Sequence, residues 1–214
     1  MTYKHAQLEW HENQPYSSEF GDIYFSSDSG LDETQYVFLA HNQLKTRWEN
    51  LKEDHFTIAE TGFGTGLNFL CAWKLWRETA APNARLHFIS TEKYPLNIDD
   101  LQKALSLWTS LSEFSDALIN QYQLVSKAWH RLMFDEGRVM LTLLIGDANA
   151  SLPKLKGAAD AWFLDGFSPA KNPDMWQTSL FEEMAKHSHS ETTFTTFTSA
   201  GDIRRGLQNA GFQV

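Results

Sequence analysis

The chain has 214 residues, of which 42% are hydrophobic and 14% aromatic, so it can bury one large core and is not a disordered segment. The single cysteine, Cys71, excludes an internal disulfide framework and fits a reducing, cytoplasmic setting. The N-terminus shows no signal-peptide pattern, and no apolar run approaches the roughly 20 residues of a membrane span. The formal net charge of −9 argues against tight nucleic-acid binding by the surface as a whole, because phosphate contacts need Lys and Arg.

A small element that packs on the main domain is predicted for residues 1–50. Aromatic runs at 7–10 and 22–25 predict a β-hairpin, with a polar turn region at 13–18 between them. A helical pattern then covers 32–48, and acidic residues begin it.

Residues 51–214 alternate between strand and helix patterns, which predicts a doubly wound, mostly parallel α/β sheet. The predicted strands cover 56–59, 86–90, 139–145, 161–164 and 192–198. The predicted helices cover 67–77, 99–108, 113–124, 173–186 and 202–209. The chain stops where another strand pattern begins, so we expect the domain to continue past residue 214.

A glycine-rich loop joins the first predicted strand of this region to the first helix, between Glu60 and Leu67. Gly62, Gly64 and Gly66 allow a tight turn and a close approach of a ligand to the backbone. The dinucleotide fingerprint needs a third glycine where Leu67 stands. A carboxylate such as Glu60 is unfavourable beside a phosphate but favourable beside the cationic amino-acid end of S-adenosylmethionine. Taken alone, the loop is equally compatible with a turn that binds nothing.

Two further acids follow the next predicted strands. Glu92 is placed to accept hydrogen bonds from ribose hydroxyls, or else is a solvated surface residue. Asp147 is placed to cap a helix, to contact an adenine amino group, or both. Because the carboxyl ends of parallel strands meet in one crevice, the glycine loop and these acids together resemble class I S-adenosylmethionine-dependent methyltransferases.

The fourth predicted strand ends at Asp165, and the loop after it resembles the active-site loop of amino-group methyltransferases. We predict that Asp165 orients an amine and accepts or relays its proton, while Phe167 and Trp176 stack on a flat ring. A turn-forming role for Asp165 and a core position for Trp176 are the alternatives.

Longer runs point to one family within this class. The runs are 22–26, 33–39, 60–70, 165–176, 197–201 and 204–208. Through them the chain is similar to the methyltransferase domain of the MnmC family of bifunctional tRNA-modifying enzymes. The resemblance implies methylation of the amine of 5-aminomethyl-2-thiouridine at the tRNA wobble position, giving 5-methylaminomethyl-2-thiouridine. It also implies tRNA as partner and, in two-domain members, a C-terminal FAD-dependent oxidase domain that this chain lacks.

The candidate site residues fall into three groups. The candidates for binding S-adenosylmethionine are Glu60, Gly62, Phe63, Gly64, Gly66, Asn68, Glu92, Lys93, Asp147, Ala148 and Asp165. The candidates for the uridine pocket are Tyr24, Glu33, Tyr36, Phe167, Pro169 and Trp176. The candidates for phosphate contacts are Lys171, Arg204 and Arg205. For Tyr24, Glu33 and Tyr36 the alternative is packing of the N-terminal element on the core, and for the three cations it is a solvated surface.

Other functions remain open at this level. A methyltransferase for a small-molecule amine suits the acidic composition, and a non-catalytic nucleotide-binding module is a second alternative. An NAD-dependent dehydrogenase is disfavoured by Leu67. Neither a metal site nor a serine hydrolase is expected, because the histidines are scattered and no G-x-S-x-G turn occurs.

Overall fold

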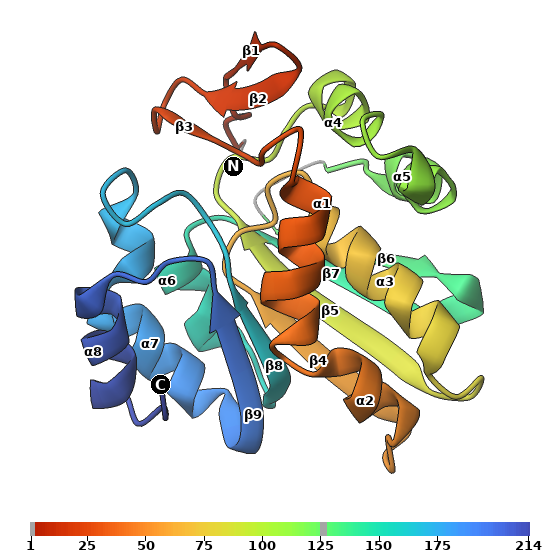
Figure 1. Ribbon diagram of the computed structural model, residues 1–214, viewed down its shortest axis with the longest axis vertical. Coiled ribbons are helices and arrows are strands. Elements are labelled where there is room, and N and C mark those ends of the chain that lie inside the picture. Colours follow the sequence, from red (N-terminus) through yellow and green to blue (C-terminus); the bar gives the residue numbers. More distant parts are fainter. Residues whose placement is uncertain (1–2, 125–127) are drawn as a thin grey trace.

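The computed structural model describes residues 3–124 and 128–214. The strands of its central sheet are β4 (His55–Glu60), β5 (Arg85–Glu92), β6 (Trp129–Phe134), β7 (Val139–Ile145), β8 (Ala159–Leu164) and β9 (Ser188–Thr196). They lie in the order β6-β7-β5-β4-β8-β9, in which β6 is antiparallel to β7 and the other neighbours are parallel (Figure 1). The predicted doubly wound, mostly parallel α/β fold is confirmed.

Both sides of the sheet are buried around β4 and β8. Successive residues of a strand point to opposite sides, so Phe56 and Ile58 join one hydrophobic cluster while Ala59 joins the other. In β8, Phe163 belongs to the first cluster and Trp162 to the second. Strands buried on both sides are almost continuously apolar, which is why the predicted core strands stood out in the sequence.

Helices cover both sides of the sheet (Figure 1). The first side and its surroundings hold α1 (Gly30–Glu33), the π-helix η1 (Thr34–Ala40), α2 (Leu44–Glu49), α3 (Leu67–Thr79), α4 (Ile98–Leu105) and α5 (Ser112–Gln121). The second side holds α6 (Ala148–Ser151), α7 (Thr178–Lys186) and α8 (Gly201–Asn209). Short 3-10 turns are η2 (Thr109–Leu111), η3 (Asp135–Gly137), η4 (Leu152–Lys154) and η5 (Pro173–Trp176).

The N-terminal sheet differs from the predicted hairpin. It has three strands, β1 (Leu8–His11), β2 (Gln14–Ser17) and β3 (Asp22–Ile23), and β2 occupies most of the predicted turn region. The reason is a two-residue turn at Glu12 and Asn13, both with positive φ (49° and 71°), which matches the twist of paired strands. The two predicted strands therefore pair with β2 and not with each other.

The predicted helix over 32–48 is interrupted. The π-helix η1 ends at Ala40, and Gln43 adopts a left-handed conformation (φ 54°) before α2 begins. The side chain of Asn42 donates from Nδ2 to the carbonyl of Phe38 (3.0 Å), so it competes with the backbone for a helical acceptor. This side-chain bond gives the chain a local reason to leave the helix at this point.

Two further differences concern the second half of the chain. The edge strand β6 was not predicted, because only alternate residues of it are buried and its outer residues, such as Trp129 and Met133, are exposed. The predicted helix over 173–186 is divided at Gln177, whose backbone is extended (ψ 152°), into η5 and α7.

Within residues 3–124 and 128–214, no helix is long and apolar enough to cross a membrane. Over the same residues, no group of three or more His, Cys, Asp or Glu side chains is arranged to hold a metal ion.

Candidate functional site

The glycine loop lies at the carboxyl end of β4, where its backbone passes close to neighbouring segments. A Cβ atom added at Gly62 would stand 3.0 Å from the carbonyl oxygen of Asp165, so this loop and the loop after β8 are in contact. Gly66 has a left-handed backbone (φ 77°), and a Cβ there would stand 2.7 Å from the ring of Phe63. Both positions need glycine, and together they open the crevice at the start of α3.

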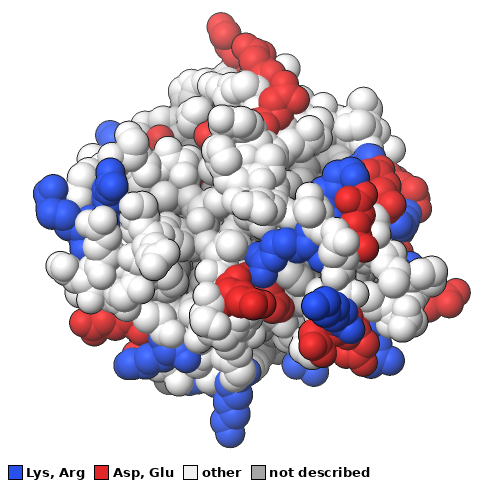
Figure 2. Space-filling model, turned by 60° about the horizontal axis from the view of Figure 1, so that its bottom comes forward, with Lys and Arg blue, Asp and Glu red and all other residues white. Residues whose placement is uncertain are grey.

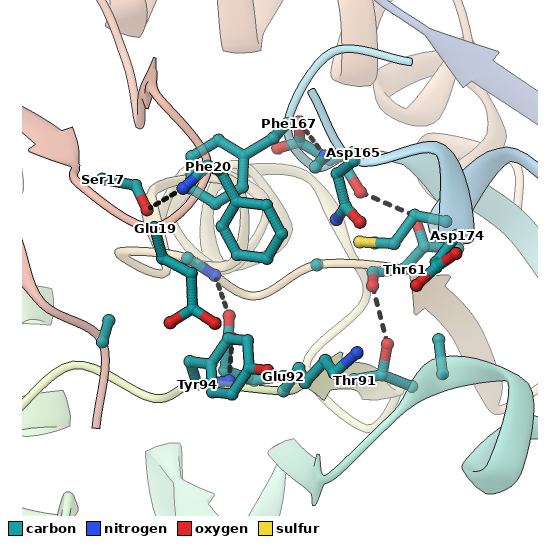
Figure 3. Close-up of a pocket in the computed structure, with 18 of the residues that line it drawn as sticks. Ser17, Glu19, Phe20, Thr61, Thr91, Glu92, Tyr94, Asp165, Phe167 and Asp174 are labelled. Carbon is teal, nitrogen blue, oxygen red and sulfur yellow. Dashed lines mark hydrogen bonds between the residues drawn. The ribbon is translucent and has the colours of Figure 1, made fainter. Parts of the chain in front are cut away.

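A first cavity lies over the ends of β4, β5, β7 and β8, and Ser17, Glu19 and Phe20 of the N-terminal element help to line it (Figure 3). One lysine lines it, Lys93, against several carboxylates. These carboxylates are Glu19, Glu92, Asp147, Asp165 and Asp174. Such a lining repels phosphate and suits a ligand that is cationic and rich in hydroxyl or amino groups.

Glu92 is fixed at the end of β5 and faces this cavity. Its Oε2 accepts from the backbone N–H of Gly64 (2.8 Å), and its Oε1 accepts from the backbone N–H of Tyr94 (2.8 Å). Burial raises the pKa of Glu92 despite these hydrogen bonds. The carboxylate therefore links the glycine loop to β5 and keeps its remaining lone pairs for a ligand.

Asp147 follows β7 and serves as a cap. Its Oδ1 accepts from the backbone N–H of Asn149 (3.0 Å) at the start of α6, and its Oδ2 lies 3.1 Å from Nζ of Lys93. The positive charge of Lys93 is therefore already paired. Ala148, the next residue, is buried and lines the same cavity.

Asp165 directly follows β8 and lines both cavities, the first and a second one described below. Its Oδ1 accepts from the backbone N–H of Gly166 (2.8 Å), and its Oδ2 accepts from Nδ2 of Asn68 (2.6 Å). Burial raises the pKa of Asp165 to about 6, and the negative charge of Glu33 adds to the increase. At neutral pH this carboxylate is a base of moderate strength in a confined place.

The second cavity lies between the N-terminal element and the start of α3. Three carboxylates line it, from Asp22, Glu33 and Asp165, and none of its described lining residues is Lys, Arg or His. Tyr24 and Asp165 also line the first cavity, so they form a shared wall between the two.

Four predicted cofactor residues lie outside the first cavity: Gly66, which lines neither cavity, and Glu60, Phe63 and Asn68. Glu60 is 1% exposed and lines neither cavity; its carboxyl group accepts from Asn68 Nδ2 (2.9 Å) and Ser90 Oγ (2.7 Å). Burial raises the pKa of Glu60 well above its usual value. Phe63 and Asn68 are buried and line only the second cavity. Direct contact of the side chains of Glu60, Phe63 and Asn68 with a ligand in the first cavity is therefore not supported.

The two predicted stacking residues, Phe167 and Trp176, lie in different surroundings. Phe167 lines the first cavity and stacks on Phe20, with ring centroids 4.7 Å apart. Trp176 is buried, lines neither cavity, and donates from Nε1 to the carbonyl of Phe167 (2.9 Å). The prediction that Trp176 stacks on substrate is thus corrected: its ring packs in the core and its N–H holds the loop that carries Phe167.

The remaining predicted substrate residues are peripheral. Tyr36 is 65% exposed, packs edge-on against His41 and lines neither cavity, and Pro169 also lines neither. Lys171 is exposed beside Gly21. The structure does not bring these residues into the site.

The two predicted arginines of α8 are exposed and engaged locally. Arg204 donates to the carbonyl of Val214 (3.2 Å), and Arg205 forms an ion pair with Asp202. Neither lines the first or the second cavity.

Several lining residues carried no recognised signal in the sequence. The first cavity includes Phe20 and Glu19 from the turn before β3, and Asn172 and Met175 from the loop after β8. Asn172 is a buried polar residue inside a run that the sequence already marked, so its amide was a findable signal. The turn residues reach the site only through long-range packing.

Comparison with known proteins agrees with this geometry. A family model described as S-adenosyl-L-methionine-dependent methyltransferase matches residues 109–214. The tRNA 5-methylaminomethyl-2-thiouridine biosynthesis bifunctional protein MnmC of Methylobacillus flagellatus is 60% identical over 212 residues, which cover 99% of this chain and 33% of that protein. The protein of the same name from Chromobacterium violaceum is 56% identical over 215 residues, covering 100% of this chain and 33% of that protein.

The chain belongs to the MnmC family. It spans about a third of the length of the curated relatives it matches. Among solved structures, MnmC2 of Aquifex aeolicus has the same fold, with a TM-score of 0.77 at 22% identity over 99% of this chain and 66% of that chain. The predicted family and the predicted use of S-adenosyl-L-methionine are thereby confirmed.

Proposed function

We propose that this chain methylates the primary amine of 5-aminomethyl-2-thiouridine at the wobble position of tRNA, giving 5-methylaminomethyl-2-thiouridine. The names of the relatives supply the product nucleoside, 5-methylaminomethyl-2-thiouridine. The observation that carries the proposal is the position of Asp165, whose carboxylate lines both cavities. A proton acceptor on a shared wall suits a reaction in which cofactor and amine approach from opposite sides.

The first cavity is the proposed cofactor site. Glu92 has free lone pairs for the ribose hydroxyls, Asp147 for an adenine amino group, and the loop at Gly62 and Gly64 lets the ligand approach the backbone. When bound, S-adenosylmethionine supplies an electrophilic methyl group on a sulfonium. The acidic lining with its single, already paired Lys93 fits this cation better than it fits a phosphate-bearing dinucleotide.

The second cavity is the proposed amine site. A primary aliphatic amine has a pKa of about 10, by analogy with lysine, so it arrives as an ammonium ion without a free lone pair. The carboxylates of Asp22, Glu33 and Asp165 favour the entry of that cation. Asp165 then accepts one proton, and the nitrogen keeps the electron pair that it needs for attack.

The tRNA and its surroundings are further parts of the proposal. On the face shown in Figure 2, Lys and Arg side chains are scattered among Asp and Glu without a continuous basic area. Lys171, Arg204 and Arg205 stay candidates for phosphate contacts because all three are exposed.

We also propose that residues 1–50 act as an accessory element and residues 51–214 as a catalytic core. The greater length of the relatives would include a linked FAD-dependent oxidase domain, which works with this core in the cytoplasm.

The direct test is methyl transfer from labelled S-adenosylmethionine to tRNA that carries 5-aminomethyl-2-thiouridine. Nucleosides are resolved by mass spectrometry, and the expected product gains one methyl group. Asp165→Asn serves as a matched variant, because it keeps the size of the side chain but cannot accept the proton.

Two outcomes would replace this proposal. Turnover of free small amines without turnover of tRNA would favour a small-molecule methyltransferase, which the net charge of −9 also suits. Cofactor binding without any product, even from a longer protein of this family tested in parallel under the same conditions, would favour a non-catalytic nucleotide-binding module.

A further inference from the structure

The side-chain amide of Asn68, in the first turn of α3, is buried between two carboxyl groups. Its Nδ2 donates to Oε1 of Glu60 (2.9 Å) and to Oδ2 of Asp165 (2.6 Å). Its Oδ1 accepts from Oγ1 of Thr34 (3.0 Å) in the π-helix η1. The amide has two N–H donors, so these contacts engage both of them as well as its oxygen.

The carboxyl group of Glu60 contacts this amide from a position outside both cavities. The side chain is 1% exposed and lines neither cavity, and its second oxygen accepts from Ser90 Oγ (2.7 Å). Burial favours the neutral form of Glu60, since it raises the pKa well above the usual value. Of the two hydrogen bonds that Asn68 Nδ2 donates, the one to Asp165 (2.6 Å) is shorter than the one to Glu60 (2.9 Å).

The carboxylate of Asp165 is therefore held by a hydrogen bond at each of its two oxygens. Gly166 N–H holds Oδ1 of Asp165, and Asn68 holds Oδ2. A carboxylate has about four lone-pair sites, so lone pairs remain free on the wall between the cavities. Rotation of the carboxylate would break one of these two hydrogen bonds.

We propose that Asn68 is a positioning residue that fixes the Asp165 carboxylate between the two cavities, and that Glu60 holds Asn68 and does not bind the cofactor. The proposal rests on the proposed role of Asp165 in accepting the amine proton. In that step one proton passes from the ammonium nitrogen to Asp165, and the electrons of the N–H bond stay on nitrogen. Asn68 neither gains nor loses a proton; it keeps the carboxylate of Asp165 oriented toward the amine.

The test compares Asn68→Ala with Asn42→Ala. Asn42 is also fully buried and donates to Phe38 O and Thr195 Oγ1, but it lines neither cavity. The carboxyl group of Asp165 is titrated by carbon-13 NMR in the ligand-free chain, and the dissociation constant of S-adenosylmethionine is measured by calorimetry. Turnover is then measured against pH at saturating cofactor.

In Asn68→Ala, we expect the titration midpoint of Asp165 to rise, because a donor that favours the carboxylate has been removed. We expect kcat to fall by about ten- to a hundredfold, as for a misplaced reacting group, with the cofactor dissociation constant nearly unchanged. Asn42→Ala destabilises the fold but leaves the midpoint of Asp165 at its wild-type value.

Two results would overturn the inference: an unmoved midpoint in Asn68→Ala, or a large loss of cofactor affinity with kcat unchanged. If Asn68→Ala does not fold, Thr34→Val replaces it, since it removes the hydroxyl that orients the amide. It should shift the midpoint in the same direction, and Thr34→Ser should restore it. If the wild-type chain methylates no amine, the proposed function fails, but the NMR titration still decides whether Asn68 holds Asp165.

Discussion

The two cavities are built in different ways. The first lies largely over strand ends and the glycine loop, whose residues are close in sequence to recognisable motifs, such as Gly64 and Glu92. The second depends on Tyr24, Glu33 and Thr34 from the N-terminal element, which pack against a core that follows them in the chain. The lining of the first cavity, the proposed cofactor site, can thus be predicted from local sequence patterns. The lining of the second, the proposed amine site, cannot, because it forms where the N-terminal element packs on the core. Asp165 belongs to both, so its substitution is the sharpest way to separate them.

The largest expected effect comes from Asp165→Ala. We expect methyl transfer to fall by about a thousandfold, within the range for loss of a general base, while cofactor affinity changes little because Glu92 and Asp147 remain. Product is measured by mass spectrometry of the nucleosides, and affinity by calorimetry. Full turnover by Asp165→Asn at every pH would show that this carboxylate takes no proton.

Glu92→Ala should act on the first cavity alone. Loss of a charged acceptor weakens cofactor binding by about ten- to a hundredfold, the equivalent of roughly 1.5–3 kcal/mol, and kcat at saturating cofactor is retained. Calorimetry and saturation kinetics separate the two effects. Glu9→Ala, which removes an exposed carboxylate from β1, is the control. A change in amine KM without a change in cofactor affinity would reverse the assignment of the cavities.

The pH dependence of turnover tests the role of Asp165, which lies between the two cavities. Burial raises the pKa of Asp165 to about 6, so the active carboxylate is lost as the pH falls through that value. We expect kcat/KM to decline about tenfold for each pH unit below 6, as for one essential base. The Asp165→Asn variant should lack this acidic limb. An acidic limb that persists unchanged in the variant would assign it to another group.

The smallest expected effect is that of Glu33→Gln. Glu33 is exposed, so solvent screens its attraction for an ammonium ion. The amine KM should rise by a few-fold, on the order of the 0.2–1 kcal/mol of an exposed ion pair, with cofactor affinity unchanged. Asp32→Asn, on the neighbouring exposed acid, provides the matched control. Equal effects of the two variants would remove Glu33 from the amine site.

The sequence predicted what depends on local pattern. The parallel strands stood out because both of their sides are buried, whereas β6 is an edge strand with one exposed side. The place of Glu60 was also readable. In β4 it shares a side with Ile58, which joins the first hydrophobic cluster, and the period of two therefore points it beneath α3. The prediction instead placed Glu60 beside the cofactor, because the glycine loop that follows it resembles the methyltransferase motif.

The rest depended on contacts that no local pattern contains. Trp176 follows a substrate-like run, but its indole lies in the core because its N–H reaches the carbonyl of Phe167. Phe20 enters the first cavity only because the turn before β3 lies over the strand ends. Such positions depend on how the N-terminal element packs on the core, and the spacing of residues along the chain does not predict this packing.

One bond across the site has a consequence for the order of assembly. The backbone N–H of Ser168 donates to Oδ2 of Asp22 (3.0 Å) across 146 positions, and Asn68 reaches Asp165 across 97. During synthesis the glycine loop is therefore made long before Asp165. Closing these long loops costs conformational entropy, which the contacts across the site must offset. The proposed site therefore depends on contacts that form only after Asp22, Asn68, Asp165 and Ser168 have all been synthesised.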